Sequence, residues 1–139
     1  MMAVGGFKVI TQKKRGSFGL DGKKEDERQI QRSIVAWARR VAPDARTQHV
    51  PMNQANRVAG AIMKGDGAAA GFSDLIVIAP GGKTLFLEVK TSSGKLSEAQ
   101  KSFANDLQLM GHNYSVVRSI DDARVAFDRA GIKMREIIA

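Results

Sequence analysis

The chain of 139 residues, 43% of them hydrophobic, is long enough for one ordinary globular core and too short for two. It has no cysteine, which excludes disulfide bridges, thiolate zinc sites and cysteine nucleophiles. The formal net charge of +8 indicates a polyanionic partner such as nucleic acid.

The positive charge is concentrated near the N-terminus. Residues 1–24 hold six Lys or Arg and one Asp, so they carry five of the eight net charges. Residues 1–22 also contain five glycines and show no sustained period, which predicts a flexible basic arm before a domain spanning 23–139. Such an arm either contacts nucleic acid or is simply solvated, and charge alone leaves both interpretations open.

Membrane and secretion signals are not expected. The apolar runs fall far short of the roughly 20 residues that a membrane-spanning helix needs, and no early apolar segment resembles a secretion signal. We therefore expect a soluble, cytoplasmic protein without a membrane partner.

Periodicity in the first half predicts one long helix and less regular structure after it. Ile30, Ile34 and Trp37 lie at helical spacing and favour a helix over 24–41 that ends before Pro43. A short extended piece is expected at 47–51. Residues 53–66 could form a small helix or an irregular excursion.

The second half predicts a hairpin followed by alternating elements. Residues 75–79 form a continuous apolar run, as in a strand buried on both faces, and 84–90 alternate between two faces around a turn at 80–83. The later pattern indicates a helix opened by Ser97 and ended at Gly111, a strand at 114–118 and a helix at 121–130. The expected fold class is therefore α/β, with a mixed central sheet flanked by helices and the order α, β, β, β, α, β, α.

Polar residues gather at the open end of this predicted hairpin. With the turn centred near residue 81, Asp74 and Glu88 fall opposite each other. Two facing carboxylates repel unless they share a proton or a cation, and oxygen ligands of this kind suit Mg²⁺ or Mn²⁺. Lys90 follows Glu88 on the same face, where an ammonium can orient an attacking water and offset charge on a phosphate. Taken alone, each residue also has a purely structural explanation, since Asp often caps a turn and Glu-x-Lys is common on solvated strands.

Four short motifs occur in an order that resembles a known family: Glu27-Arg28-Gln29-Ile30-Gln31, Gly71-Phe72-Ser73-Asp74-Leu75, Glu88-Val89-Lys90 and Gly94-Lys95-Leu96-Ser97-Glu98-Ala99-Gln100. Together they resemble the VRR-NUC (virus-type replication-repair nuclease) family of the PD-(D/E)xK superfamily, over about residues 25–123. The resemblance implies a restriction-endonuclease-like αβββαβ core and Mg²⁺- or Mn²⁺-dependent cleavage of structured DNA, in a bacterial or phage-encoded protein. Ser73 departs from the superfamily's proline, which is not a ligand.

The resemblance also implies roles for individual residues. Asp74, Glu88 and the Val89 carbonyl would bind the metal, and Lys90 would be the catalytic lysine. Glu27 maps onto the family's helix glutamate and would reach the metal through water, although an acid in a first helical turn also complements the helix dipole. Gln31 and Gln100 would support these ligands. Ser97 and Gln100 also form a capping-box pattern that has a structural role of its own.

Other candidate residues are assigned by charge and position. Five basic residues are candidates for a phosphate groove around the centre: Lys95, Arg57, Lys64, Lys101 and Arg118. We expect His49 and His112 to be structural, because neither has a partner at metal-ligand spacing. Trp37 lies at core spacing and is not expected to stack on bases.

The expected activity is that of an endonuclease resembling Holliday-junction resolvases, with branched DNA as substrate and a homodimer as the working form. Two alternatives stay open. One is a catalytically inactive nucleic-acid-binding module, against which the intact Asp74, Glu88 and Lys90 argue. The other is a restriction or mobile-element endonuclease that reads a base sequence, although no additional recognition domain is apparent.

Overall fold

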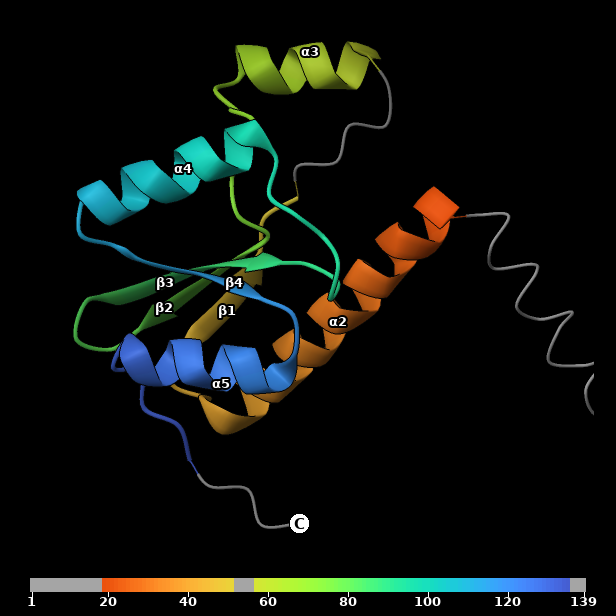
Figure 1. Ribbon diagram of the computed structural model, residues 1–139. Helices are drawn as coiled ribbons and strands as arrows, with labels where there is room; N and C mark the ends of the chain where they lie inside the picture. The colour runs from red at the N-terminus through yellow and green to blue at the C-terminus, as the bar shows by residue number, and fades with distance from the viewer. Residues whose placement is uncertain (1–18, 52–56, 136–139) are drawn as a thin grey trace, which may run out of the picture.

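The computed structural model describes residues 19–51 and 57–135 of the chain (Figure 1). The expected order of elements is present, with one short helix in addition. The elements are α2 (Gly19–Val41), β1 (Arg46–His49), α3 (Arg57–Gly65), β2 (Leu75–Ala79), β3 (Lys83–Val89), α4 (Glu98–Leu109), β4 (Asn113–Val117) and α5 (Ile120–Arg129).

The strands form one mixed sheet in the order β1-β2-β3-β4. The first two pairings are antiparallel, whereas β4 runs parallel to β3. In the β2–β3 hairpin Leu75 lies opposite Leu87 and Ala79 opposite Lys83, so the turn is centred on residue 81 as the sequence predicts. Gly81 and Gly82 form this turn with φ of +84° and +72°, values that favour glycine. The fold class is therefore α/β, as expected.

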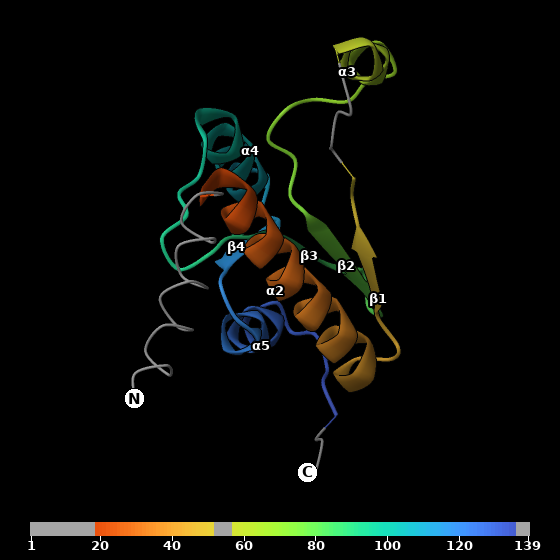
Figure 2. The same cartoon turned by 90° about the vertical axis from the view of Figure 1, so that its right-hand side faces the viewer.

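One face of the sheet carries the main hydrophobic core. Alternate side chains of β2 and β3, such as Val77 and Leu87, are buried there against α2 and α5. Trp37 of α2 packs edge-on against Phe127 of α5 with ring centroids 5.1 Å apart, which confirms its predicted place in the core. Figures 1 and 2 show α2 and α5 side by side along this layer.

The opposite face packs against α4 through aromatic side chains. Phe86 of β3 contacts Phe72 and Phe103, with ring centroids 6.1 Å apart in each pair. Phe103 of α4 in turn contacts Tyr114 of β4 at 6.4 Å. Because side chains two residues apart share a strand face, Glu88 lies on the same side of the sheet as Phe86. The sheet therefore presents Glu88 to α4.

Two boundaries differ from the sequence-based prediction. The helix expected at 24–41 begins at Gly19, because helix propagation past the first turn adds one hydrogen bond per residue and can extend through isolated glycines. The ambiguous segment 53–66 contains α3, which stands apart from the sheet in both views. Of the arm predicted at 1–22, residues 1–18 lie outside the described residues, and residues 19–22 belong to α2. None of the helices in the described ranges has the length and apolar character needed to cross a membrane.

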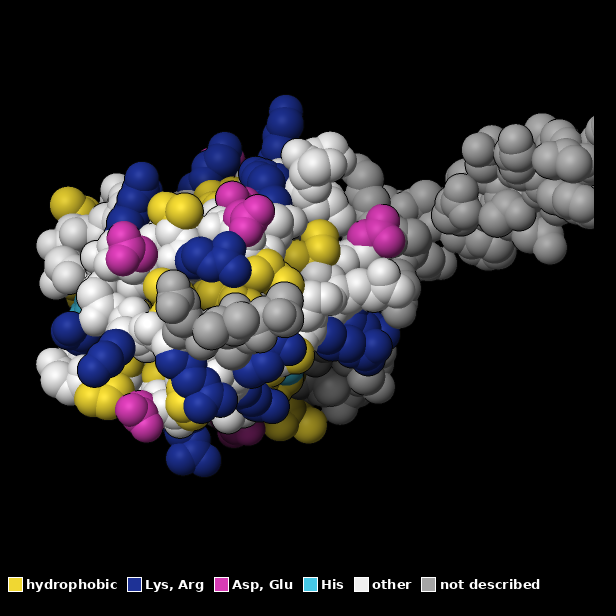
Figure 3. Space-filling model, turned by 90° about the horizontal axis from the view of Figure 1, so that it is seen from below, with side chains coloured by type: hydrophobic (Ala, Val, Ile, Leu, Met, Phe, Trp, Pro, Cys, Tyr) yellow, Lys and Arg dark blue, Asp and Glu magenta, His cyan; other side chains and the backbone are white. Residues whose placement is uncertain are grey.

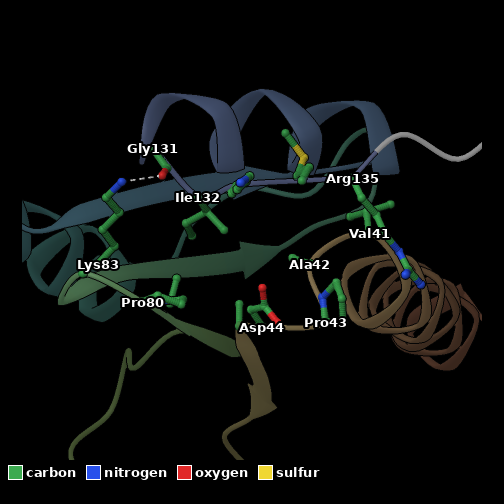
Figure 4. Close-up of a pocket in the computed structure, with 14 residues that line it drawn as sticks. Val41, Ala42, Pro43, Asp44, Pro80, Lys83, Gly131, Ile132 and Arg135 are labelled. Carbon is green, nitrogen blue, oxygen red and sulfur yellow. Dashed lines mark hydrogen bonds between the residues drawn. The ribbon is translucent and has the colours of Figure 1, made fainter.

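The segment after α5 contacts the hairpin turn and the end of α2. Lys83 Nζ donates to the Gly131 carbonyl at 2.7 Å, and the Arg135 amide donates to the Val41 carbonyl at 2.7 Å (Figure 4). A cavity of about 500 Å³ lies between these contacts. Figure 3, which views the molecule from below Figure 1, shows Lys and Arg side chains beside exposed apolar groups. Asp74 and Glu88 lie at the other ends of β2 and β3, so this cavity is separate from the predicted catalytic centre.

Candidate active site

Asp74 is held at the start of β2 by its main chain and its side chain. Its carboxylate Oδ2 accepts a hydrogen bond of 2.8 Å from the Val89 amide, which ties it to the end of β3. Its carbonyl accepts from the Val50 amide at 2.9 Å and lies 3.0 Å from His49 Nδ1. The hairpin register continues from the Leu75–Leu87 pair, so Asp74 faces Glu88 as predicted.

The loop before Asp74 approaches the first turn of α4 closely. Gly71 has φ of +91°, and a Cβ there would lie 2.3 Å from the Ala99 carbonyl oxygen. Ser73, which stands where the superfamily has proline, is fully buried and its hydroxyl donates to the Leu75 carbonyl at 3.2 Å. Ser73 thus has a structural role next to Asp74.

Glu88 is a buried carboxyl group, with only 2% of its surface exposed. Its Oε2 accepts a hydrogen bond of 3.0 Å from Gln100 Nε2 and lies 3.7 Å from Lys90 Nζ. Its Oε1 is also buried but has no hydrogen-bond donor among the described residues. Burial first, and then the charge and hydrogen bonding of Asp74, raise the pKa of Glu88 to about 8.

Lys90 lies directly after β3 and is mostly buried, with 12% of its side chain exposed. Its amide donates to the Val117 carbonyl at 3.0 Å, so β4 fixes its main chain. The ammonium opposes the rise in the Glu88 pKa. The structure thus brings together three of the four predicted catalytic residues: Asp74, Glu88 and Lys90.

The fourth predicted residue, Glu27, approaches this group from α2. It is partly buried, and its negative charge makes a small contribution to the raised pKa of Glu88. Gln31, one turn further along α2, contacts His49 rather than a carboxylate, with Nε2 3.1 Å from Nδ1. The same ring nitrogen lies near the Asp74 carbonyl, where it must donate, so it cannot also accept from Gln31 Nε2 and the two contacts are alternatives.

Gln100 has both of the roles that its sequence pattern allows. Its backbone N–H donates to Ser97 Oγ at 3.1 Å, and its side-chain Oε1 accepts from the backbone N–H of Ser97 at 2.8 Å. These two hydrogen bonds complete the capping box of α4. The remaining end of the side chain, Nε2, donates to Glu88.

The five basic residues predicted to line a phosphate groove are placed differently from one another. Arg118 Nη1 donates to the carbonyls of Thr91 and Gly94, the latter at 2.8 Å, so this guanidinium braces the loop after Lys90. Lys101 forms an exposed ion pair with Glu98 at 3.1 Å. The side chains of Lys95 and Lys64 are exposed, and that of Arg57 lies outside the described side chains.

Two residues, His49 and Tyr114, lie near the carboxyl pair although the sequence pattern did not place them there. His49 was expected to be structural, and its contact with the Asp74 carbonyl gives that role a precise place at the site. Tyr114 received no role, although burial and then the charges of Glu88 and Asp74 raise its pKa. Its position depends on how β4 pairs with β3, which local periodicity does not encode.

The residues at this centre fit a divalent cation bound through oxygen. Glu88 Oε1 is a buried acceptor without a donor, and Asp74 faces Glu88 across the hairpin. The Val89 amide points toward Asp74, and a residue's amide and carbonyl point to the same neighbouring strand, so the Val89 carbonyl lies on this side too. In the described part of the chain no three His, Cys, Asp or Glu side chains form a ready-made cage. Water would complete the coordination shell, as is common for Mg²⁺.

The sequence matches one family model over most of its length. The model of the VRR-NUC domain matches residues 20–121, which is most of the chain. The chain belongs to the VRR-NUC family. A solved structure described as a VRR-NUC domain protein is 24% identical, with a TM-score of 0.58 over 75% of this chain and 86% of that chain. A second VRR-NUC domain structure is 18% identical, with a TM-score of 0.48 over 76% of this chain and 94% of that chain. No curated protein matches the chain.

Membership in the VRR-NUC family confirms the resemblance carried by the four sequence motifs. The matched region contains Asp74, Glu88 and Lys90, and the solved structure with the TM-score of 0.58 supports the same fold. The protein therefore has a nuclease-type fold.

Proposed function

We propose that this VRR-NUC protein is a Mg²⁺- or Mn²⁺-dependent endonuclease that hydrolyses phosphodiester bonds in DNA. The observation that carries this proposal is the environment of Glu88, a buried carboxyl group whose Oε1 has no hydrogen-bond donor among the described residues, opposite Asp74 and 3.7 Å from Lys90. Buried acidic groups that face each other are costly in a purely structural role, because each disfavours ionisation of the other. A cation-binding role accounts for this arrangement.

The carboxylates would hold the cation, with the Val89 carbonyl as a third protein ligand and Glu27 acting through water. When bound, such a cation supplies charge stabilisation at the phosphate and lowers the pKa of a coordinated water. Asp74 and Glu88 come from neighbouring strands whose register is fixed, so their carboxyl groups are positioned before substrate binds.

Lys90 would act on the water and on the phosphate. Hydrolysis forms a bond between a water oxygen and phosphorus, breaks one backbone P–O bond and delivers a proton to the leaving oxygen. The mostly buried ammonium of Lys90 is held near Glu88, where it can orient the attacking water and stabilise the additional negative charge of the transition state. Gln100 keeps Glu88 Oε2 engaged, which would leave Oε1 to bind the cation.

DNA would reach the centre over basic residues from different parts of the fold. Lys95 and Lys64 have exposed side chains suited to phosphate contacts, whereas Lys101 and Arg118 would keep part of their hydrogen-bonding capacity for the protein. The basic residues of the N-terminal segment, among them Lys13, Lys14 and Arg15, would add sequence-independent affinity. We further propose branched DNA as the preferred substrate, a homodimer as the working form, and the bacterial cytoplasm as its location.

A direct cleavage assay tests the proposed function. The full chain is incubated with four-way junctions, linear duplex and single-stranded DNA of matched sequence, with Mg²⁺, with Mn²⁺ or with EDTA. We expect endonucleolytic products only with metal, and none from the Glu88→Gln variant prepared in parallel. The variant replaces one carboxylate oxygen with an amide at almost constant volume, so it keeps the packing beside Gln100.

The assay also separates the alternatives. Tight DNA binding without cleavage under any metal condition would instead support the inactive binding module. Cleavage confined to one base sequence in linear duplex would support a restriction or mobile-element endonuclease.

A further inference from the structure

Tyr114 carries a buried hydroxyl group that has no partner. The ring lies on β4 and contacts Phe103 of α4 with centroids 6.4 Å apart. The hydroxyl oxygen is inaccessible to solvent and makes no hydrogen bond to any described residue. Buried hydroxyl groups are almost always hydrogen-bonded, so a side chain of this kind requires an explanation.

The surroundings of this hydroxyl are those of Glu88. In the parallel β3–β4 pair Tyr114 lies beside Phe86, and Phe86 shares its strand face with Glu88. On α4, Phe103 contacts Tyr114 and Gln100 contacts Glu88, and these two helix residues are one turn apart. Tyr114 and Glu88 therefore occupy the same layer between the sheet and α4.

Each of the two residues has one unsatisfied buried oxygen in this layer. These are the hydroxyl oxygen of Tyr114 and Oε1 of Glu88. Burial, and then the charges of Glu88 and Asp74, raise the pKa of the phenol, so it stays protonated and able to donate. A buried water commonly makes about three hydrogen bonds to groups of this kind.

We propose that Tyr114 is a positioning residue for the metal site, whose hydroxyl group donates through one water molecule to Glu88 Oε1. This inference rests on the proposed function. A carboxylate oxygen has two lone pairs, so Oε1 can accept this hydrogen bond and still bind a cation. Gln100 and Lys90 fix Oε2 from one side, and Tyr114 fixes Oε1 from the other. The carboxylate then cannot rotate away from Asp74.

The test measures Mn²⁺ binding by calorimetry in the absence of DNA. Tyr114→Phe removes only the hydroxyl group and keeps the aromatic packing. Thr47→Val is the matched control, because Thr47 also has a buried, unpartnered hydroxyl but lies on β1, at the far edge of the sheet from β4. We expect Mn²⁺ affinity to fall about tenfold in Tyr114→Phe, the usual scale for a residue behind a metal ligand, and to stay unchanged in Thr47→Val.

A second measurement uses the protein without substitution. The chain has one tyrosine and one tryptophan, so growth with fluorotyrosine or fluorotryptophan places a single ¹⁹F label at Tyr114 or at Trp37. Substoichiometric Mn²⁺, which is paramagnetic, should broaden the Tyr114 resonance much more than that of Trp37 on the other face of the sheet. This measurement can overturn the role even if Tyr114→Phe fails to fold, because a Tyr114 far from the bound ion would not be broadened selectively.

The outcomes distinguish this inference from the function on which it rests. If the wild-type chain binds no Mn²⁺, both are wrong. If it binds Mn²⁺ but Tyr114→Phe binds equally well, or if the Tyr114 resonance is broadened no more than that of Trp37, the role of Tyr114 is wrong while the proposed function stands. Weakened binding confined to Tyr114→Phe, with selective broadening, supports the role.

Discussion

Gln100 donates its side-chain amide to Glu88 at 3.0 Å while the oxygen of the same amide accepts from the backbone of Ser97 at 2.8 Å. One side chain thus joins the first turn of α4 to the central carboxylate of the site. The end of the helix therefore helps to position Glu88, through the side chain of Gln100. The two roles can be separated by substitution.

Ser97→Ala and Gln100→Ala separate the helix cap from the contact with Glu88. Ser97→Ala removes the capping hydroxyl and should lower the free energy of unfolding by about 1 kcal/mol with little change in cleavage. Gln100→Ala should cost similar stability but also lower the cleavage rate by about tenfold, because Glu88 Oε2 loses its donor. Urea unfolding and single-turnover cleavage measure the two effects. Equal cleavage by both variants would show that the contact with Glu88 has no catalytic importance.

Substitutions in the proposed catalytic group should abolish turnover while leaving DNA binding intact. We expect Asp74→Ala, Glu88→Ala and Lys90→Ala each to lower cleavage by at least about a hundredfold, because each removes an interaction made in the transition state. Lys133→Ala provides a control, since Lys133 is an exposed cation at the opposite end of the sheet. Fluorescence anisotropy with labelled DNA measures binding. Near-normal cleavage by Lys90→Ala would remove the lysine from the mechanism.

The raised pKa of Glu88 predicts how stability depends on pH in the absence of divalent metal. The unfolded chain releases this proton near pH 4.5, whereas the folded chain holds it until about pH 8. The folded state therefore binds more protons between these values, and its stability falls as pH rises through this window. We expect the Tm to drop by roughly 5–10 °C between pH 5 and 8.

Glu88→Gln and added metal provide the controls for this pH dependence. An amide does not titrate, so the Tm of the variant should fall much less between pH 5 and 8 than that of the wild type. Added Mg²⁺ should raise the Tm of the wild-type chain more at pH 8 than at pH 5, because it binds the ionised carboxylate. If the Tm of the variant falls with pH as steeply as that of the wild type, other groups cause the pH dependence.

Two glycines with positive φ provide a matched test of the approach between the Asp74 loop and α4. Gly71 has φ of +91° and would place a Cβ 2.3 Å from the Ala99 carbonyl, whereas Gly67 has φ of +102° with open space around it. Gly67→Ala should cost only the backbone strain of about 1–2 kcal/mol. Gly71→Ala should cost about 2–4 kcal/mol, because α4 must also move. Urea unfolding compares them, and equal losses would mean that the contact is easily relieved.

The hairpin and its carboxylates were predictable from sequence because their determinants are local. A turn at residues 80–83 and strict alternation in 84–90 fix the register, and the register alone places Asp74 opposite Glu88. Trp37 was predictable in the same way, since its spacing from Ile34 and Val41 defines the buried side of α2.

The surroundings of the carboxylates were not predictable, because they depend on contacts between distant segments. Tyr114 reaches this layer only because β4 runs parallel to β3, and His49 reaches Asp74 only because β1 pairs with β2. Arg118 shows what charge alone does not determine. Its charge suggested a phosphate contact, but the fold directs its guanidinium to the carbonyls of the 91–94 loop. Charge identifies a side chain that can bind phosphate, whereas only tertiary structure shows whether it is already engaged.

We expect the protein to work as a homodimer and to cut four-way junctions in preference to linear duplex. The described fold contains one sheet and one carboxyl pair, and a single recognition module alone usually buries about 600–1,000 Å² of protein surface. So small a domain has little surface for reading bases, and selectivity should then come from the shape of the DNA. Two subunits related by a two-fold axis would hold two catalytic centres at a fixed separation, which suits paired incision of a near-symmetric junction.

Light scattering should give twice the mass of 15.0 kDa, and cleavage of junctions should exceed that of duplex of the same sequence by at least about tenfold. Mixing wild-type chains with excess Glu88→Gln chains provides the control, because mixed dimers should nick one strand and leave the opposite strand intact. A monomer at assay concentrations that cuts junction and duplex equally would require a different account of its selectivity.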